Sequence, residues 1–159
     1  MFDMSYAKAL RRIYSSLHGK PLNWVVTGSC SFALQGVPVI PNDIDLQADL
    51  PGALAIEQHL SKYVVRKVKF STAEKIRSHF GELCVNGIKV EIMGDVQKRL
   101  ADGTWEKPVD LEQYKRFVEF RGMEIPVLAL EYEYEAYMKL GRFEKAEMLK
   151  GSIASTEAL

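Results

Sequence analysis

Two aspartates on an alternating segment constrain the fold of this chain more than any other feature. In Asp43-Ile44-Asp45-Leu46, acidic and apolar residues alternate, which is typical of a half-buried strand. Residues two apart on a strand project from the same face, so both carboxylates lie on one side while the apolar residues enter the core. Their Cα atoms are roughly 7 Å apart, close enough to hold one cation or to bridge two. The segment therefore predicts a sheet with an acidic, metal-binding face.

A second alternating segment supplies a third acid. Residues 88–93 alternate apolar and polar side chains, which places Glu91 on the polar face of a strand. If this strand lies beside residues 43–46, the Glu91 carboxylate meets both aspartates. Several hard oxygen ligands suit Mg²⁺ or Mn²⁺, which keep open positions for substrate phosphates. An ion pair between Glu91 and Lys89 on a solvent-facing strand is the alternative interpretation.

A glycine turn precedes the acidic strand. Residues 22–27 form a short run rich in β-branched residues, followed by Gly28, Ser29 and a helical stretch of small residues that reaches residue 34. Glycine permits close backbone approach, and the amides at a helix N-terminus favour an anion. The hydroxyl of Ser29 or Ser31 adds a donor. This turn is a candidate phosphate site, with Gly28, Ser29 and Ser31 as its residues.

The remaining elements indicate an α+β fold with a mixed β-sheet flanked by helices. Asn86-Gly87 is a strong hairpin signal between two strands, and Arg121-Gly122 separates a further antiparallel pair. The expected helices are 5–17, 51–62, one that ends at Gly141, and 142–150; the expected strands are 22–27, 43–46, 64–70, 81–85, 88–93, 114–120 and 123–127. We expect one domain over residues 1–159, with a core at about 20–127, C-terminal helices at about 128–150 and a small polar tail.

Overall charge and composition disfavour several classes of partner, although they do not exclude a local basic cleft. Lys plus Arg (21) equal Asp plus Glu (21), so no net field attracts a long nucleic acid or an anionic membrane. The N-terminus does not resemble a leader, and no apolar run approaches the roughly 20 residues that span a bilayer. We expect a cytoplasmic protein. Cys30 and Cys84 lack metal or disulfide spacing and are expected to be small buried residues.

These motifs together resemble a known signature. The chain contains VVTGSCSFALQGVPVIPNDIDLQAD and, later, IKVEIM. This arrangement resembles the DNA polymerase β-like nucleotidyltransferase superfamily, in which a Gly-Ser turn, a spacer, an acid-x-acid strand and a third acid on a later strand follow one another. The resemblance covers residues from about 22 to 93. The motif positions are Gly28, Ser29, Asp43, Asp45 and Glu91.

The resemblance implies transfer of a nucleoside monophosphate from an NTP to a small-molecule or protein acceptor, with release of pyrophosphate. Asp43, Asp45 and Glu91 would be the catalytic residues and the ligands of Mg²⁺ or Mn²⁺. The segment IPVLALEYEYEAYMKLGR is similar to a helix of the small antibiotic nucleotidyltransferases in which a lysine reaches the phosphates. Lys139 would take that role, with Arg142 second, although both residues also fit a solvated helix. A homodimer would be one way to complete the cleft.

Two further functions remain open at this point. The first is a catalytically silent module that binds a nucleotide or a partner on the same fold, because the chain shows no evident acceptor domain. The second is a metal-dependent phosphohydrolase with an aspartate nucleophile in the D-x-D segment. The phosphohydrolase is the weaker alternative, because no companion motif with a lysine or threonine accompanies the aspartates.

Overall fold

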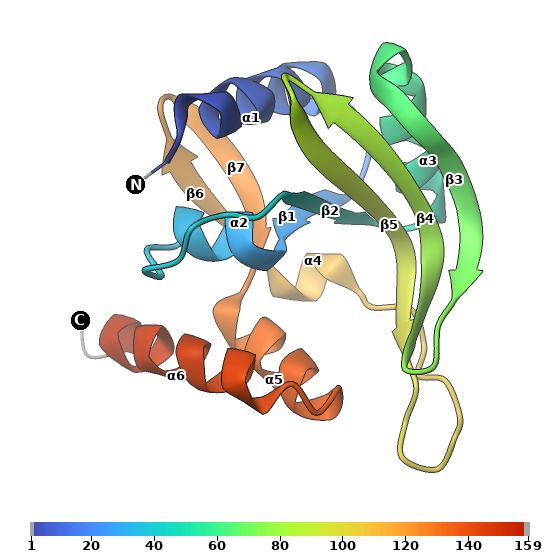
Figure 1. The fold of residues 1–159 in the computed structure, drawn as a ribbon, viewed down its shortest axis with the longest axis vertical. Coiled ribbons are helices and arrows are strands. Elements are labelled where there is room, and N and C mark those ends of the chain that lie inside the picture. Colours follow the sequence, from blue (N-terminus) through green and yellow to red (C-terminus); the bar gives the residue numbers. More distant parts are fainter. Residues whose placement is uncertain (1, 158–159) are drawn as a thin grey trace.

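The computed structural model describes residues 2–157, which contain one seven-stranded mixed sheet (Figure 1). The strands are β1 (Trp24–Thr27), β2 (Ile44–Ala48), β3 (Val64–Thr72), β4 (Ile76–Val85), β5 (Ile88–Lys98), β6 (Lys115–Phe120) and β7 (Met123–Leu128). Their order is β3-β4-β5-β2-β1-β7-β6. The pairs β2–β5 and β1–β7 are parallel and the other neighbours are antiparallel. The predicted α+β fold with a mixed sheet is confirmed.

Helices cover both faces of this sheet (Figure 1). They are α1 (Met4–Leu17), α2 (Gly28–Leu34), α3 (Leu50–His59), the 3₁₀ turn η1 (Ser61–Tyr63), α4 (Leu111–Tyr114), α5 (Leu130–Lys139) and α6 (Phe143–Glu157). The main core lies beneath α1 and α3, where Leu10 and Ile56 pack against Ile44 and Leu46 of β2. Within residues 2–157, no helix combines the length and the apolar character needed to cross a bilayer.

The opposite face of the sheet is covered by α2, α5 and α6. A second apolar cluster joins these helices through Phe32, Leu130 and Leu149, all of which are buried. Because Ile44, Leu46 and Ala48 point into the main core, the intervening residues of β2 face α5. The C-terminal helices therefore fold over the polar side of the central strand.

Two expectations for the chain need correction. The last helix continues to Glu157 instead of ending at residue 150 in a polar tail, because Leu149 is fully buried and Ile153 packs against the second cluster. Residues 158 and 159 of the expected tail lie outside the described residues. Cys30 is buried as expected, but Cys84 is exposed, because Leu83 and Val85 take the buried face of β4.

Candidate active site

Three carboxylates meet where β2 and β5 lie side by side. Asp45 is the direct neighbour of Glu91 in the parallel β2–β5 register, and Asp43 immediately precedes β2. One carboxylate oxygen from each residue lies within 4.8 Å of the other two. The convergence predicted from the two alternating segments is therefore present in the structure.

The electrostatics of this acidic cluster fit a bound cation. Burial, together with the charges of Asp43 and Glu91, raises the pKa of Asp45 to about 7. Burial also raises the pKa of Asp43, with Glu91 as the next cause. Asp45 Oδ1 is buried and has no hydrogen-bond partner. Lys89 Nζ lies 3.1 Å from Glu91 Oε1, but the lysine side chain is half exposed, so this ion pair offsets little of the repulsion.

Gly28 forms the corner beside the cluster. Its φ is +71°, and a Cβ at this position would lie only 2.5 Å from Asp45 Oδ2. Only glycine therefore lets the β1–α2 turn approach the carboxylate this closely. The hydroxyl of the next residue, Ser29, accepts a hydrogen bond from the backbone N–H of Asn42 at 2.9 Å. Ser29 thereby anchors the loop that leads into Asp43.

A fourth acid, Glu133 of α5, was not among the residues predicted for the site. It is buried and accepts hydrogen bonds from the Thr27 hydroxyl and from the Gly28 amide, the latter at 3.2 Å. Burial, with a smaller contribution from the charge of Asp45, raises the pKa of Glu133 to about 8, although the hydrogen bonds from Thr27 and Gly28 lower it. Its Oε2 atom has no hydrogen-bond partner. The sequence signal was weak, since one acid among several in α5 shares the buried face of the helix with Leu130.

Ser31 lies beneath this group, away from open solvent. Its side chain is fully buried, and its hydroxyl accepts a hydrogen bond from Gln35 Nε2 at 3.0 Å. The Ser31 hydroxyl is also close enough to Glu133 to lower the pKa of the glutamate. The structure therefore places Ser31 as a support for Glu133.

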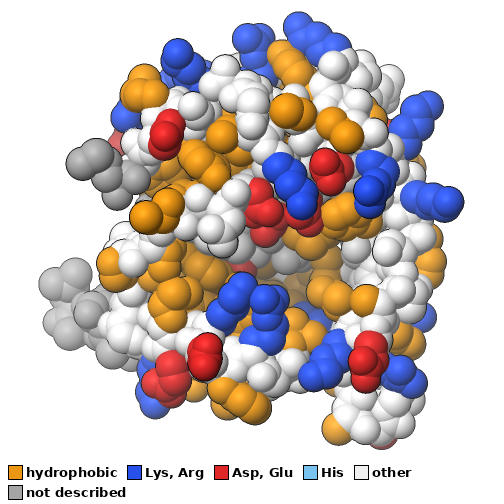
Figure 2. Space-filling model, viewed as in Figure 1, with side chains coloured by type: hydrophobic (Ala, Val, Ile, Leu, Met, Phe, Trp, Pro, Cys, Tyr) orange, Lys and Arg blue, Asp and Glu red, His pale blue; other side chains and the backbone are white. Residues whose placement is uncertain are grey.

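A cleft of about 140 Å³ separates the sheet from α5. Asp45, Gln47 and Gly28 line it from the sheet side, and Glu133 lines it from α5. Figure 2 shows the molecule hollowed between a group of acidic side chains and a group of basic ones. Gln47 Oε1, like the free oxygens of Asp45 and Glu133, is buried without a hydrogen-bond partner. The cleft therefore presents several unpaired oxygen atoms to a ligand.

Basic groups line the helical side of the cleft. Arg142 lies at its edge, with its guanidinium 5.4 Å from the ring centre of Tyr137. Lys145 Nζ lies 5.7 Å from the same ring. Burial and the charge of Arg142 lower the pKa of Lys145, whereas Asp45 and Asp43 raise it. Lys145 was not predicted from the sequence; it lies over the ring of Tyr137, which lines the cleft, and is near enough to Asp45 and Asp43 for their charges to act on its pKa.

Lys139 is turned away from the cleft. Its Nζ lies 3.3 Å from Glu106 Oε2, and the lysine side chain is half exposed. Lys98 Nζ lies 3.0 Å from the same glutamate and donates a hydrogen bond to the Tyr132 hydroxyl at 2.9 Å. Unlike Lys139, Lys98 is buried and lines the cleft. Of the two basic residues predicted from the C-terminal helices, the structure brings only Arg142 to the site.

Comparison with known proteins agrees with this geometry. Residues 9–153 match the model of the aminoglycoside-2''-adenylyltransferase family. A crystal structure of a "putative nucleotidyltransferase" from Thermotoga maritima is 62% identical in sequence, with a TM-score of 0.87; the match covers 98% of this chain and 96% of that one. No curated protein matches the chain.

Two antibiotic-modifying enzymes share the fold at much lower identity. The lincosamide antibiotic adenylyltransferase LnuA, bound to lincomycin, is 11% identical, with a TM-score of 0.56 over 94% of this chain and 97% of that one. ANT(2'')-Ia, in complex with adenylyl-2''-tobramycin, is 10% identical, with a TM-score of 0.59 over 97% of this chain and 91% of that one. At these sequence identities, the comparison shows a shared fold and nothing more.

Proposed function

The chain belongs to the aminoglycoside-2''-adenylyltransferase family, and on that premise we propose that it transfers a nucleoside monophosphate from an NTP to a hydroxyl of a small-molecule or protein acceptor. The observation that carries the proposal is the meeting of Asp43, Asp45 and Glu91 within 4.8 Å, beside the turn at Gly28. Carboxylates in this number suit Mg²⁺ or Mn²⁺ together with substrate phosphates.

In this proposal the three carboxylates hold the divalent metal. The metal would neutralise the triphosphate and orient it for in-line displacement. The buried, unpartnered oxygen of Asp45 and the raised pKa values of both aspartates fit such a cation, because a positive charge favours their ionised forms.

The chain's own residues would position the two substrates. The turn at Gly28 and Ser29 offers backbone amides to the phosphates, and Arg142 and Lys145 face the acids from the helical side. The acceptor hydroxyl oxygen bonds to the α-phosphorus as the bond to the leaving pyrophosphate breaks. Glu91 takes the hydroxyl proton, since it is less enclosed than Asp45. Position and charge supply most of the acceleration in such a transfer.

The cleft also favours an acceptor substrate that carries many hydrogen-bonding hydroxyl or amine groups. The unpartnered Gln47 Oε1 is a hydrogen-bond acceptor in the cleft, whereas Glu133 Oε2 donates a hydrogen bond while the glutamate is protonated, below its raised pKa of about 8. A buried acceptor left unpaired costs free energy, so a ligand that brings hydroxyl or amine groups gains by meeting it. We therefore propose a small molecule with several hydroxyl or amine groups as the acceptor. ATP is the proposed donor, in line with the adenylyl transfer for which the family is named.

A calorimetric titration of ATP with Mg²⁺ tests the proposal. Wild type should bind the nucleotide only with the metal, whereas Asp43→Asn/Asp45→Asn should lose this affinity. Asp102→Asn/Asp110→Asn is the matched control, because it removes the same charge from exposed positions. Equal nucleotide affinity in wild type and the cleft variant, or none in either, would contradict a metal-dependent site.

A second candidate is a catalytically silent module that binds a nucleotide or partner on the same fold. The observation in its favour is the cleft volume of about 140 Å³, which is below the ~300 Å³ at the lower end of sites for one ligand and so leaves no evident room for both a nucleotide and an acceptor. Pyrophosphate release across a panel of hydroxyl- and amine-bearing acceptors separates the two functions. Nucleotide binding without any release favours the silent module, and reproducible transfer excludes it.

A further inference from the structure

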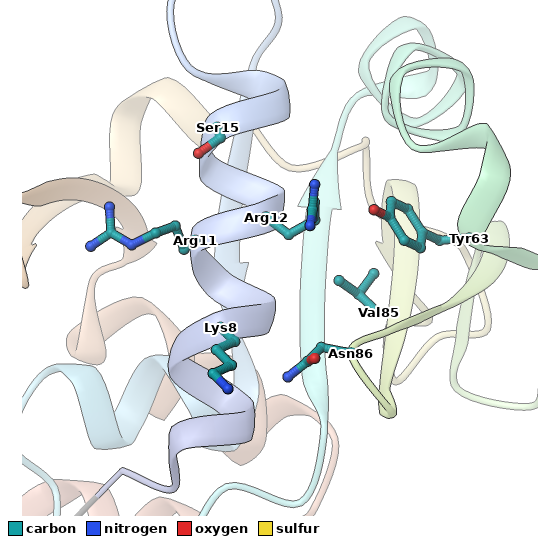
Figure 3. Close-up of a pocket in the computed structure, with 7 residues that line it drawn as sticks. All are labelled: Lys8, Arg11, Arg12, Ser15, Tyr63, Val85 and Asn86. Carbon is teal, nitrogen blue, oxygen red and sulfur yellow. The ribbon is translucent and has the colours of Figure 1, made fainter.

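A basic groove lies on the α1 side of the sheet, away from the cleft. It has a volume of about 520 Å³ and runs between α1 and the turn that joins β4 to β5. Lys8, Arg12 and Ser15 line it from α1, and Tyr63 and Asn86 line it from the facing elements. In Figure 3 the Tyr63 hydroxyl and the Asn86 amide are turned toward the helix. We refer to this site as the basic groove.

The helical spacing of the cations makes the groove continuous. Lys8, Arg11, Arg12 and Ser15 follow the i, i+3, i+4, i+7 pattern, so they form a polar stripe beside the apolar stripe that α1 buries. The stripe is about 10 Å long at 1.5 Å per residue. Arg11 is partly engaged, since its Nη2 donates to the Arg121 carbonyl oxygen at 2.7 Å. Lys8 and Arg12 are exposed and take part in none of the ion pairs found within residues 2–157.

The groove runs between two segments that contain no acid, and the cations that line it all come from the first of them, in α1. Residues 4–20 and 58–73 carry four Lys or Arg each, eight of the chain's 21, and no Asp or Glu. The fold brings the two segments together, because Tyr63 opposes α1 across the groove. Figure 2 shows Lys and Arg side chains along the upper and right-hand rims, over α1 and β3. The zero net charge of the whole chain therefore conceals a strongly uneven distribution.

The chemistry of the lining favours a phosphodiester strand. Lysine, arginine and asparagine side chains offer N–H donors, and the hydroxyls of Ser15 and Tyr63 add two more. The one apolar lining residue, Val85, is itself buried. Protein interfaces have an apolar core, whereas nucleic-acid interfaces are more polar and positively charged. The Tyr63 ring, with Lys62 Nζ 5.3 Å from its centre, provides a surface on which a base can stack.

We propose that the basic groove binds a single strand of nucleic acid through its phosphates, at a site separate from the cleft. The expectation that a long nucleic acid is not a partner rests on the net charge. The groove is defined instead by local charge, which governs binding within about 10 Å at 0.1 M salt. The proposal does not depend on the proposed transferase activity, because its ligand contacts none of the cleft residues.

Fluorescence anisotropy with labelled single strands tests the groove. RNA and DNA strands of one sequence are titrated in EDTA without NTP, at about 50 and 200 mM salt, where phosphate contacts predict a clear loss of affinity. With about three phosphates engaged, the log–log slope should be near −2. Equal binding of both strands supports recognition of the phosphodiester, and a preference for one identifies the type of nucleic acid.

Two groove variants and a matched control locate the strand. Lys8→Gln/Arg12→Gln should weaken binding by at least about tenfold and flatten the salt slope. Tyr63→Leu should weaken it about fivefold or more, through lost stacking. The control Lys107→Gln/Lys150→Gln removes the same charge from exposed positions outside the groove and should change the affinity less than about twofold, because screening limits distant charges.

Several outcomes would overturn the proposal. One is that no strand binds at the lower salt concentration, and another is that the control variant loses as much affinity as the groove variant. A third is that a polyglutamate peptide binds as tightly as the strand, which would indicate an acidic protein partner. Tighter binding of a duplex would exclude the single strand. Asp43→Asn/Asp45→Asn should bind the strand as wild type does, so failure of the groove and failure of the transferase proposal are distinguishable. A changed affinity in that variant would place the strand in the cleft instead.

Discussion

The two walls of the cleft are built in different ways. On the sheet wall, hydrogen-bonded register fixes the acids, since Asp45 pairs directly with Glu91 and with Thr27. On the helical wall, Glu133 and Arg142 reach the cleft only because α5 and α6 pack onto the sheet through the second apolar cluster. The alternation that places the acids on one face of each strand is local and periodic, whereas helix docking depends on contacts that are distant in the sequence.

The two walls also differ in charge and in their effect on the stability of the folded state. Like charges crowd the sheet wall, where burial and mutual repulsion raise the pKa values of Asp43 and Asp45. Cations stand opposite, on Arg142 and Lys145. An unoccupied acidic cluster therefore destabilises the folded state, and a ligand that neutralises the cluster stabilises it. We expect substitutions on the sheet wall to have the larger effects.

Asp45→Asn should have the largest effect and should separate function from stability. The substitution removes one of three repelling carboxylates, so the metal-free protein should melt at a higher temperature than wild type. Wild type should gain about 2.7 kcal/mol from Mg²⁺ at 100 times its Kd, and the variant close to nothing. Nucleotidyl transfer should fall by about a thousandfold, of the order seen when one transition-state contact is lost.

Thermal melting with and without Mg²⁺ checks this expectation, with Asp102→Asn as the control. Asp102 is an exposed carboxylate outside the cleft, hydrogen-bonded to Thr104, so its loss should leave the Mg²⁺ effect unchanged. If Asp45→Asn is stabilised by the metal as much as wild type, the acids of the sheet wall are not its ligands.

Gly28→Ala tests how closely the turn must approach the sheet wall. The new methyl group would lie 2.5 Å from Asp45 Oδ2 at a φ of +71°, so both crowding and backbone strain oppose folding. Gly36→Ala is a matched control, because its φ is +88° and no atom lies within 4 Å of the added Cβ. The control should cost about 1 kcal/mol of unfolding free energy, as expected for backbone strain alone. Gly28→Ala should cost at least about 2 kcal/mol more, as overpacking does, and chemical denaturation measures both. Equal costs would show that Asp45 moves aside freely.

Arg142→Gln should have a smaller effect, on nucleotide affinity. An exposed arginine at the edge of the cleft is expected to contribute about 1.4 kcal/mol to phosphate binding, a tenfold change in Kd. Lys139→Gln removes the same charge three residues away, but Lys139 pairs with Glu106 outside the cleft, so its Kd should change less than about twofold. Calorimetry with ATP and Mg²⁺ measures both variants. A larger loss of nucleotide affinity in Lys139→Gln would support the sequence-based prediction that Lys139, ahead of Arg142, contacts the phosphates.

The sheet wall could be predicted from the sequence because its determinants are local. Alternation placed Asp43, Asp45 and Glu91 on one face, and the glycine before α2 indicated the turn. One step was not local, namely that β2 and β5 lie side by side. That step came from the resemblance to polymerase β-like nucleotidyltransferases, which the family match confirms. The roles of these residues stay predictions.

The helical wall could not be predicted in the same way. The helical spacing of Leu130, Tyr134, Tyr137 and Leu140 predicts an apolar stripe on α5, but the structure buries Glu133 beside Leu130. A buried glutamate looks like a surface residue in a sequence, because glutamates are rarely buried unless they have partners. Its partners, Thr27 and the Gly28 amide, are more than 100 residues away in the sequence, so only the tertiary structure reveals the site.

Glu133→Gln should have the smallest effect on stability and a distinctive dependence on pH. Burial raises the folded-state pKa of Glu133 from 4.5 to about 8. As pH rises from 4.5 toward 8, the unfolded chain loses this proton while the folded protein keeps it, so the contribution to stability falls with pH.

Glutamine keeps an acceptor for Thr27 and Gly28 but does not titrate. Wild type should therefore lose at least about 1 kcal/mol more than the variant between pH 5 and 8 in urea denaturation without metal, since one pKa unit corresponds to about 1.4 kcal/mol. The difference between the two proteins therefore reports the titration of Glu133, including its coupling to the charge of Asp45. Parallel stability curves for the two proteins would show that Glu133 is ionised in the folded state and that the walls do not differ as described.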